Sequence, residues 1–87
     1  MTYFDPAGSD DTEPRAINDT ADVTGYYNLA TDSIYRGFLR LANGTIISYT
    51  PPGAVWGTYA VSINHKDNMT GYFADANYVY HGFIGRP

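Results

Sequence analysis

AINDTADVTGYY (Ala16–Tyr27) returns later in the chain as SINHKDNMTGYF (Ser62–Phe73), at an offset of 46 residues. IYRGFL (Ile34–Leu39) returns as VYHGFI (Val79–Ile84) at an offset of 45, so the first copy has one extra residue in the turn Asn28–Ser33. A period in this range is typical of solenoids, propellers and repeat arrays, in which each unit covers its apolar face with a neighbour. The 87 residues are therefore interpreted as one repeat domain, 1–87, built from two copies of a unit.

Short runs of β-branched and aromatic residues fill each copy, and Asn, Asp, Gly and Pro separate them, which predicts strands and turns. No apolar stripe at helical spacing runs longer than a turn, so no helix is predicted. Asn43-Gly44 predicts a hairpin with a type I′ turn, which needs positive φ at both positions. The predicted strands are Arg15–Asn18, Val23–Asn28, Ile34–Leu41, Thr45–Tyr49, Thr58–Asn64, Met69–Ala74 and Val79–Ile84.

The order of these strands predicts an all-β fold of two four-stranded β-propeller blades. Residues 15–49 form an intact blade. Residues 58–87 supply three strands of the second blade, and Met1–Phe4, which aligns with Ile46–Tyr49, is the fourth strand of that split blade. Because an open sheet edge invites pairing, we expect another chain to complete the split blade. The residues predicted to form this interface are Thr2, Tyr3, Phe4, Val79, Tyr80 and Phe83.

The expected partner is therefore a second copy of the chain, and the first choice is a trimer with six blades. Head-to-tail contacts close into a ring where the rotation fits and otherwise run on as a filament, so a filament-forming structural protein is the alternative. With a net charge of −4 and five Lys and Arg, the chain is not expected to bind nucleic acid or an anionic membrane. No apolar run approaches 18 residues, and no secretory signal pattern opens the chain.

The repeat resembles the bacterial HAF repeat, a probable extracellular repeat. Arg36 departs from that pattern, because the family has His at this position. The resemblance implies an exported or cell-surface protein that is not an enzyme, and it hands over no active-site residues. The motifs that carry it are Ser62-Ile63-Asn64, Thr70-Gly71-Tyr72-Phe73, Asp75-Ala76-Asn77, Tyr80-His81-Gly82-Phe83 and Tyr49-Thr50-Pro51-Pro52-Gly53-Ala54.

No combination of residues in the sequence predicts catalysis, a cofactor or a metal. Nucleophile-elbow, phosphate-loop and zinc-helix motifs are missing, and there is no cysteine. His81 is interpreted mainly as a structural hydrogen-bonding residue, because Arg36 replaces it in the other copy and a metal ligand would not tolerate that change. The acidic segment Asp5–Glu13 lacks the oxygen spacing of a calcium loop and is interpreted as a solvated loop. Glycines inside predicted strands indicate bulges or close backbone approach; they are Gly25, Gly37, Gly71 and Gly82.

Trp56 is the residue with the clearest functional potential, because it lies in the linker between the two units. Two interpretations stay open: Trp56 packs as a wedge between blades, or its ring stacks on a sugar in an inter-blade pocket. The second rests on the architecture of small propeller lectins alone. A carbohydrate site of this kind would be formed by Trp56, Tyr59, Tyr49, Arg36 and His81.

Overall fold

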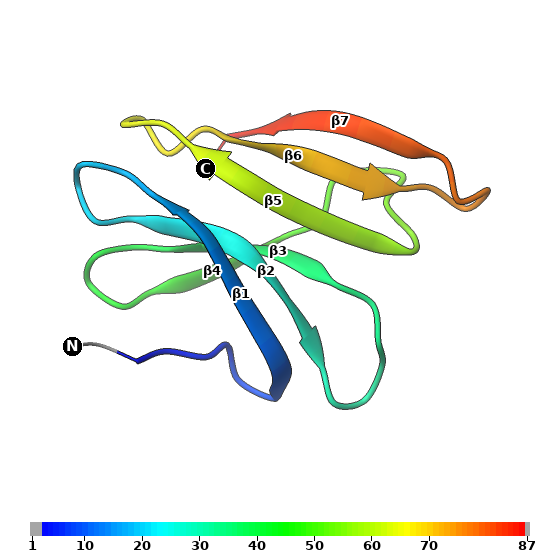
Figure 1. The fold of residues 1–87 in the computed structure, drawn as a ribbon, viewed down its shortest axis with the longest axis horizontal. Helices are drawn as coiled ribbons and strands as arrows, with labels where there is room; N and C mark the ends of the chain where they lie inside the picture. Colours follow the sequence, from blue (N-terminus) through cyan, green and yellow to red (C-terminus); the bar gives the residue numbers. More distant parts are fainter. Residues whose placement is uncertain (1–2, 87) are drawn as a thin grey trace.

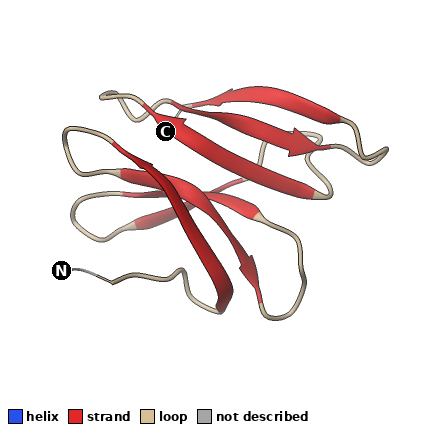
Figure 2. Cartoon of the chain, in the orientation of Figure 1, coloured by secondary structure: helices blue, strands red, loops and turns tan. Residues whose placement is uncertain are grey.

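The computed structural model describes residues 3–86, which form two antiparallel sheets (Figures 1 and 2). The first sheet consists, in spatial order, of β1 (Ser9–Ile17), β2 (Val23–Leu29), β3 (Arg36–Arg40) and β4 (Ile46–Tyr49). The second consists of β5 (Gly57–Ile63), β6 (Met69–Ala74) and β7 (Tyr80–Gly85). The described residues contain no helix long and apolar enough to cross a membrane. The all-β prediction is confirmed, and each sheet is a meander of consecutive strands.

The predicted strand boundaries agree with β2 to β7 to within two residues. The prediction for β1 is wrong, because this strand begins at Ser9, six residues before the predicted start at Arg15, and includes most of the acidic segment. Pro14 is tolerated in it because β1 is an edge strand of its sheet. Tyr3 and Phe4 lie outside the seven strands, and Met1 and Thr2 lie outside the described residues.

The two sheets share one local irregularity, which shows that the sequence repeat is also a structural repeat. The β1–β2 register shifts between Pro14 and Ala16, opposite Gly25, and the β5–β6 register shifts between Ala60 and Ser62, opposite Gly71. A Cβ on Gly25 would lie 2.1 Å from the Glu13 carbonyl oxygen, and one on Gly71 would lie 2.0 Å from that of Tyr59. The prediction that these two glycines mark bulges is confirmed, since no side chain fits against a bulged backbone this close.

The hairpin at Asn43-Gly44 is confirmed, but the predicted turn type is wrong. Gly44 has φ of 98°, whereas Asn43 is not among the residues with positive φ. The Gly44 amide donates to the Leu41 carbonyl at 2.8 Å, and the Leu41 amide donates to the Thr45 carbonyl at 2.8 Å. A three-residue loop that ends on one left-handed residue has this pattern. The same construction recurs in three other hairpins, with Ala21, Asp67 and Tyr78 as the left-handed residue.

The two sheets pack face to face through small and apolar side chains. We call the side of the first sheet that contacts the second the Leu39 face; it comprises Thr24, Tyr26, Gly37 and Leu39. The facing side of the second sheet, the Phe83 face, comprises Thr58, Ala60, Met69, Phe73, Phe83 and Gly85. Leu39, Thr24, Thr58 and Ala60 are at most 1% exposed, so this contact is the core of the molecule. The Thr58 amide also donates to the Tyr35 carbonyl at 2.8 Å across the contact.

Each sheet has a second face that points away from this core. In the first sheet it is the Phe38 face, formed by Val23, Tyr27, Phe38 and Arg40. In the second sheet it is the Ile84 face, formed by Thr70, Tyr72, Tyr80, Gly82 and Ile84. The N-terminal segment runs along the side of the first sheet opposite the second sheet (Figure 1), and there Phe4 packs on Phe38 with ring centroids 5.7 Å apart. The Ile84 face has no such cover within residues 3–86.

Candidate functional site

Trp56 lies in the loop before β5 and stacks on a turn of its own sheet. Its ring is parallel to that of Tyr78, with an interplanar angle of 6° and centroids 5.1 Å apart. The indole Nε1 donates to the Ala76 carbonyl at 3.4 Å. Trp56 is 42% exposed and Tyr78 67% exposed, so the pair forms an aromatic surface at the β6–β7 turn. Trp56 therefore contacts the second sheet, and the described structure does not place it as a wedge between the two sheets.

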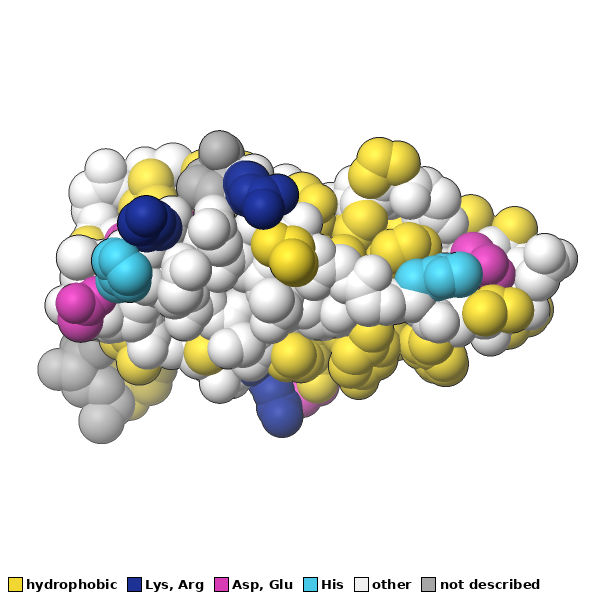
Figure 3. Space-filling view, turned by 90° about the horizontal axis from the view of Figure 1, so that it is seen from above, with side chains coloured by type: hydrophobic (Ala, Val, Ile, Leu, Met, Phe, Trp, Pro, Cys, Tyr) yellow, Lys and Arg dark blue, Asp and Glu magenta, His cyan; other side chains and the backbone are white. Residues whose placement is uncertain are grey.

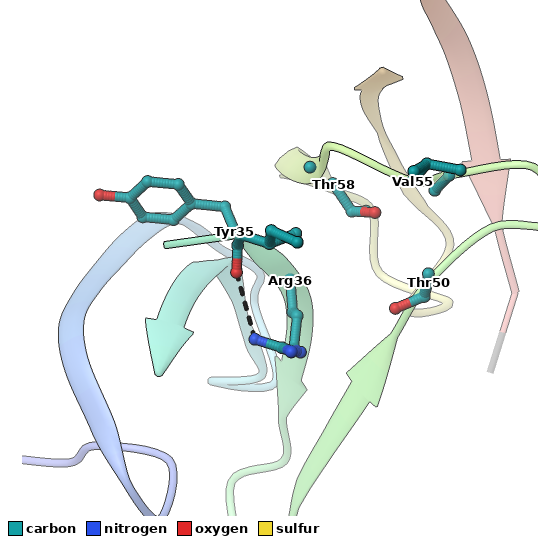
Figure 4. A pocket seen from close by; sticks show the side chains of 8 residues that line it. Tyr35, Arg36, Thr50, Val55 and Thr58 are labelled. Atoms are coloured by element: carbon teal, nitrogen blue, oxygen red, sulfur yellow. Dashed lines mark hydrogen bonds between the residues drawn. The ribbon is translucent and has the colours of Figure 1, made fainter. Parts of the chain in front are cut away.

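Arg36 lines a hollow of about 190 Å³ between the ends of the sheets (Figure 4). Its guanidinium donates to both Asp32 carboxylate oxygens, at 3.1 and 2.7 Å, and to the Ile34 carbonyl at 3.2 Å. The Arg36 guanidinium holds the pKa of Asp32 below its ordinary value. The hollow is completed by Ile34, Tyr35, Thr50, Ala54, Val55, Gly57 and Thr58.

His81 occupies the position in β7 that corresponds to Arg36 in β3, and it too pairs with an aspartate of the preceding turn. Its Nε2 lies 2.8 Å from Asp75 Oδ2, and its ring lies 5.2 Å from that of Phe73. The hydrogen bond with His81 lowers the pKa of Asp75, and the Val79 and Asn77 amides lower it further. Both copies therefore keep a nitrogen-bearing side chain hydrogen-bonded to the turn aspartate, which is a structural reason for accepting either Arg or His.

The five residues predicted for a carbohydrate site do not line one pocket. Arg36 lies in the hollow, whereas Tyr49 packs on Phe83 with ring centroids 5.4 Å apart and His81 lies beside Asp75. Tyr59 lies between Tyr26 and Tyr72, at 5.0 Å from each ring centroid. Of the aromatic residues in the prediction, Trp56 alone belongs to the exposed surface described above.

A cluster of five tyrosines runs from the first sheet to the second, and the sequence analysis missed it. Ring centroids 5.0 to 5.7 Å apart connect its members, which are Tyr26, Tyr35, Tyr59, Tyr72 and Tyr80. The signal in the sequence was the repetition of Tyr26 as Tyr72 and of Tyr35 as Tyr80, which places all four on corresponding faces. Spacings of this size are those of favourable edge-to-face and offset ring pairs.

The acidic segment contacts this cluster instead of forming a solvated loop. The Tyr35 hydroxyl donates to Asp11 at 2.7 Å, and the Tyr26 hydroxyl donates to Glu13 at 3.3 Å. The hydrogen bond to Asp11 raises the pKa of Tyr35 to about 12. Burial is the main cause that raises the pKa of Tyr26, and the charge of Glu13 adds to it. These carboxylates have tyrosine partners, and within residues 3–86 no three acidic or histidine side chains gather as metal ligands.

A pair of carboxyl groups joins the β1–β2 turn to the β5–β6 turn. Asp22 is buried and accepts from the backbone amide of Ala42 at 2.8 Å. Asp67 is half-buried and accepts from the side-chain Nδ2 of Asn18 at 2.8 Å. The hydrogen bond from Asp67 lowers the pKa of Asp22, while burial and that same bond raise the pKa of Asp67. Each carboxyl group therefore influences the ionisation of the other across the contact between the repeats.

The residues predicted for an interface between chains fall into three groups. In the N-terminal group, Thr2 lies outside the described residues, Tyr3 is 86% exposed, and Phe4 packs on Phe38 of the same chain. Val79 and Tyr80 are 50% and 63% exposed at the start of β7. Phe83 is half-buried against Tyr49 of the same chain, so its side chain contributes to the core contact between the sheets.

No model of a known protein family, no curated protein and no solved structure matches this chain. The resemblance to the HAF repeat therefore stays an interpretation of the sequence motifs.

Proposed function

We propose that this chain is a non-enzymatic repeat module of the extracellular type that assembles with further copies of itself by strand completion. The observation that carries the proposal is a pair of corresponding contacts. Tyr49, on β4 of the first sheet, packs on Phe83 of the second at 5.4 Å, and Phe4 packs on Phe38 of the first at 5.7 Å. Both members of the second contact lie 45 positions before their equivalents.

The next position along the strand supports the same correspondence. Tyr49 also covers Gly85, where a Cβ would lie 3.0 Å from its ring, and Phe4 lies under the equivalent residue, Arg40, whose guanidinium is 5.1 Å from the ring centroid. These contacts support the proposal that the segment around Phe4 acts as the fourth strand of a preceding sheet. In this proposal, the other three strands of that preceding sheet come from another copy of the chain.

The second sheet is the matching half. Within residues 3–86 β7 pairs only with β6, whereas its counterpart β3 pairs with both β2 and β4. An edge of unpaired backbone groups is a template for a further strand. In the proposed assembly the N-terminal segment of one copy pairs with β7 of another, and each sheet becomes a four-stranded propeller blade. Six blades in a trimer remain the first choice, and a filament is the alternative if the rotation does not close.

Deleting residues 1–4 tests strand completion. Truncation removes the segment proposed to pair with β7 of another copy, so the truncated chain is expected to dissociate at micromolar concentration. It also removes Phe4, whose burial on Phe38 of its own chain contributes roughly 1.5–3 kcal/mol, so circular dichroism checks that the truncated chain folds. Analytical ultracentrifugation gives the mass of the wild-type and truncated chains. A full-length chain that carries Thr31→Ser, in the exposed turn between β2 and β3, serves as the control. An unchanged mass after truncation would contradict strand completion.

Carbohydrate binding is a second candidate, and the exposed Trp56–Tyr78 pair is the observation that favours it. Exposed flat aromatic surfaces offer sugars an apolar face beside polar groups. Because Trp56 is the only tryptophan, its fluorescence reports on this surface alone. A glycan-array screen followed by fluorescence titration is expected to show saturable quenching that Tyr78→Ala weakens. Titrations without saturation for every array hit would reject this candidate.

A further inference from the structure

The two copies of the unit have similar residues at three matching positions, but these residues are buried in the first sheet and exposed in the second. On the Leu39 face, Leu39 is 1% exposed and Thr24 is 0% exposed. On the Ile84 face, the equivalent of Leu39 is Ile84, which is 60% exposed, and the equivalent of Thr24 is Thr70, which is also exposed. The buried Gly37 corresponds to the exposed Gly82 in the same way. An apolar branched residue, a threonine and a glycine thus recur at matching positions, but only the first copy has a partner on them.

In the first sheet, these three positions pack against the Phe83 face of the second sheet. The first sheet itself has an equivalent of the Phe83 face. Thr58, Met69 and Phe83 correspond to Thr12, Val23 and Phe38, so the Phe38 face repeats the Phe83 face in outline. It is open beside Phe4, where a hollow of about 360 Å³ exists. Ile17, one of the residues that line this hollow, is 66% exposed.

A hydrogen bond from a side chain to the backbone supports the same correspondence between the two copies. The side-chain Nδ2 of Asn18 donates to the backbone carbonyl of Asn64 at 2.9 Å across the contact between the sheets. Asn64 is the equivalent of Asn18, and its Oδ1 accepts from the Lys66 and Asn68 amides as Asn18 Oδ1 accepts from Thr20 and Asp22. Within residues 3–86 the Asn64 amide nitrogen has no hydrogen-bond acceptor, so it is oriented like Asn18 but lacks the next repeat.

We propose that the Ile84 face of one copy docks on the Phe38 face of a second copy, in the register that the Leu39 and Phe83 faces already have within the chain. This rests on the proposed self-assembly and adds the second surface that the assembly uses. The face is suited to burial, because Tyr72, Tyr80 and Ile84 are 42%, 63% and 60% exposed on it. Figure 3, seen from above, shows exposed hydrophobic side chains at several places on the surface, with charged and His side chains beside some of them. The Asn64 amide then donates to the Asn18 carbonyl of the second copy. Docked faces and completed strands meet at one junction, because Phe4 already lies on the Phe38 face.

The register of the junction can be tested by disulfide trapping, since the chain has no cysteine. A Cβ on Gly37 would lie 3.4 Å from Thr58 Cγ2, and the equivalent pair between copies is Gly82 and Thr12. A mixture of Gly82→Cys and Thr12→Cys chains is therefore expected to form a mixed disulfide under mild oxidation. Gly82→Cys mixed with Asn77→Cys, in the exposed β6–β7 turn of the second sheet, is the matched control. Equal trapping in both mixtures, or none in the first, would overturn the register.

Ile84→Lys tests the face independently of strand completion. Because Ile84 is 60% exposed in the single chain, the variant is expected to fold, and circular dichroism checks this. We expect its dissociation constant for assembly to rise at least about tenfold, while Val55→Lys, outside the face, leaves it unchanged. If Ile84→Lys keeps the wild-type mass while truncation of residues 1–4 dissociates the assembly, strand completion holds and this docking is wrong. If only Ile84→Lys dissociates it, the docking holds and strand completion is wrong. A monomeric wild-type chain would overturn both.

Discussion

The first sheet and the second sheet are two copies of one design in two different environments. Leu39 and Ile84 occupy the same position, and one is in the core while the other is exposed. The bulges opposite Gly25 and Gly71 have the same register shift, and the turn residues Ala21 and Asp67 have φ of 65° and 63°. Local structure therefore follows the repeated sequence, whereas burial follows from having a neighbour. Leu39 is buried because a second repeat lies against it, whereas Phe38, on the opposite face of the same sheet, is buried under Phe4 of the N-terminal segment.

Leucine and isoleucine truncations should separate the two environments most strongly. Leu39→Ala leaves a cavity between the sheets and is expected to lower the free energy of unfolding by about 2–5 kcal/mol. Ile84→Ala, at the equivalent exposed position, is expected to change it by less than about 0.5 kcal/mol in the dissociated chain. Urea unfolding at low protein concentration measures both. Equal losses would mean that the Ile84 face is covered even in the single chain.

Alanine in place of the paired glycines should give effects of opposite sign. A Cβ on Gly37 lies 3.0 Å from the Tyr49 carbonyl oxygen and 3.4 Å from Thr58, so Gly37→Ala is expected to cost about 1–3 kcal/mol. Gly82 has nothing closer than 3.9 Å, and there alanine is expected to stabilise the chain by about 0.5–1 kcal/mol through reduced backbone entropy. Thermal unfolding followed by circular dichroism compares the two. A loss at Gly82 of the same size would contradict the open space on this face.

The Asp22–Asp67 pair predicts a pH dependence that only the internal contact has. Asp67 has a raised pKa when folded, so its contribution is complete below the unfolded value near 3.8 and is lost as pH rises through the folded pKa. Asp22 has a lowered pKa, so its contribution is present above that value and is lost as pH falls. Asp67→Asn keeps a donor toward Asp22 without an ionisable group. We expect it to stabilise the chain at pH 7 and to have little effect near pH 3.

Urea unfolding at several pH values measures this difference. Asp19→Asn, in the exposed part of the same turn, is the control and is expected to leave the profile unchanged. Destabilisation of Asp67→Asn at pH 7 would contradict the raised pKa of Asp67.

The smallest expected effect is at the left-handed turn residues. Ala21 has φ of 65° where the corresponding hairpin in the first sheet uses Gly44 at 98°. Ala21→Gly is expected to stabilise the chain by about 0.5–1 kcal/mol, because a left-handed residue with a Cβ costs about 1–2 kcal/mol and glycine removes part of it. Gly44→Ala is the reverse change and should destabilise it. Calorimetric melting temperatures that move in the same direction for both would contradict this explanation.

The repeat and the turn residues predicted most of the fold, because hairpin meanders are specified by local patterns. The extension of β1 from Ser9 to Pro14 was not predictable in this way. Its acidic residues have poor strand propensity, and tyrosines of β2 and of the β2–β3 loop stabilise it through their hydroxyl groups. The turn at Asn43-Gly44 differs from the prediction because one extra loop residue needs only one positive φ.

The candidate sites were less predictable because they depend on contacts distant in sequence. Trp56 was identified as unusual, but its stacking partner Tyr78 lies in a turn whose left-handed conformation the sequence does not indicate. The Asp22–Asp67 pair joins positions that are not equivalent in the repeat, since Asp67 aligns with Ala21. The sequence repeat predicts the features that the two copies share, but it does not predict the features that differ between them.

In the proposed assembly this difference would make successive junctions chemically unlike. Every second junction would lie within a chain and hold the Asp22–Asp67 pair, while every other junction would lie between chains, where Asn68 and Ala21 occupy the two equivalent positions. Neighbouring blades are then alike in backbone but alternate in chemistry, so a closed ring has half the rotational symmetry that its blades suggest. Acid titrates only one of the two kinds of junction directly.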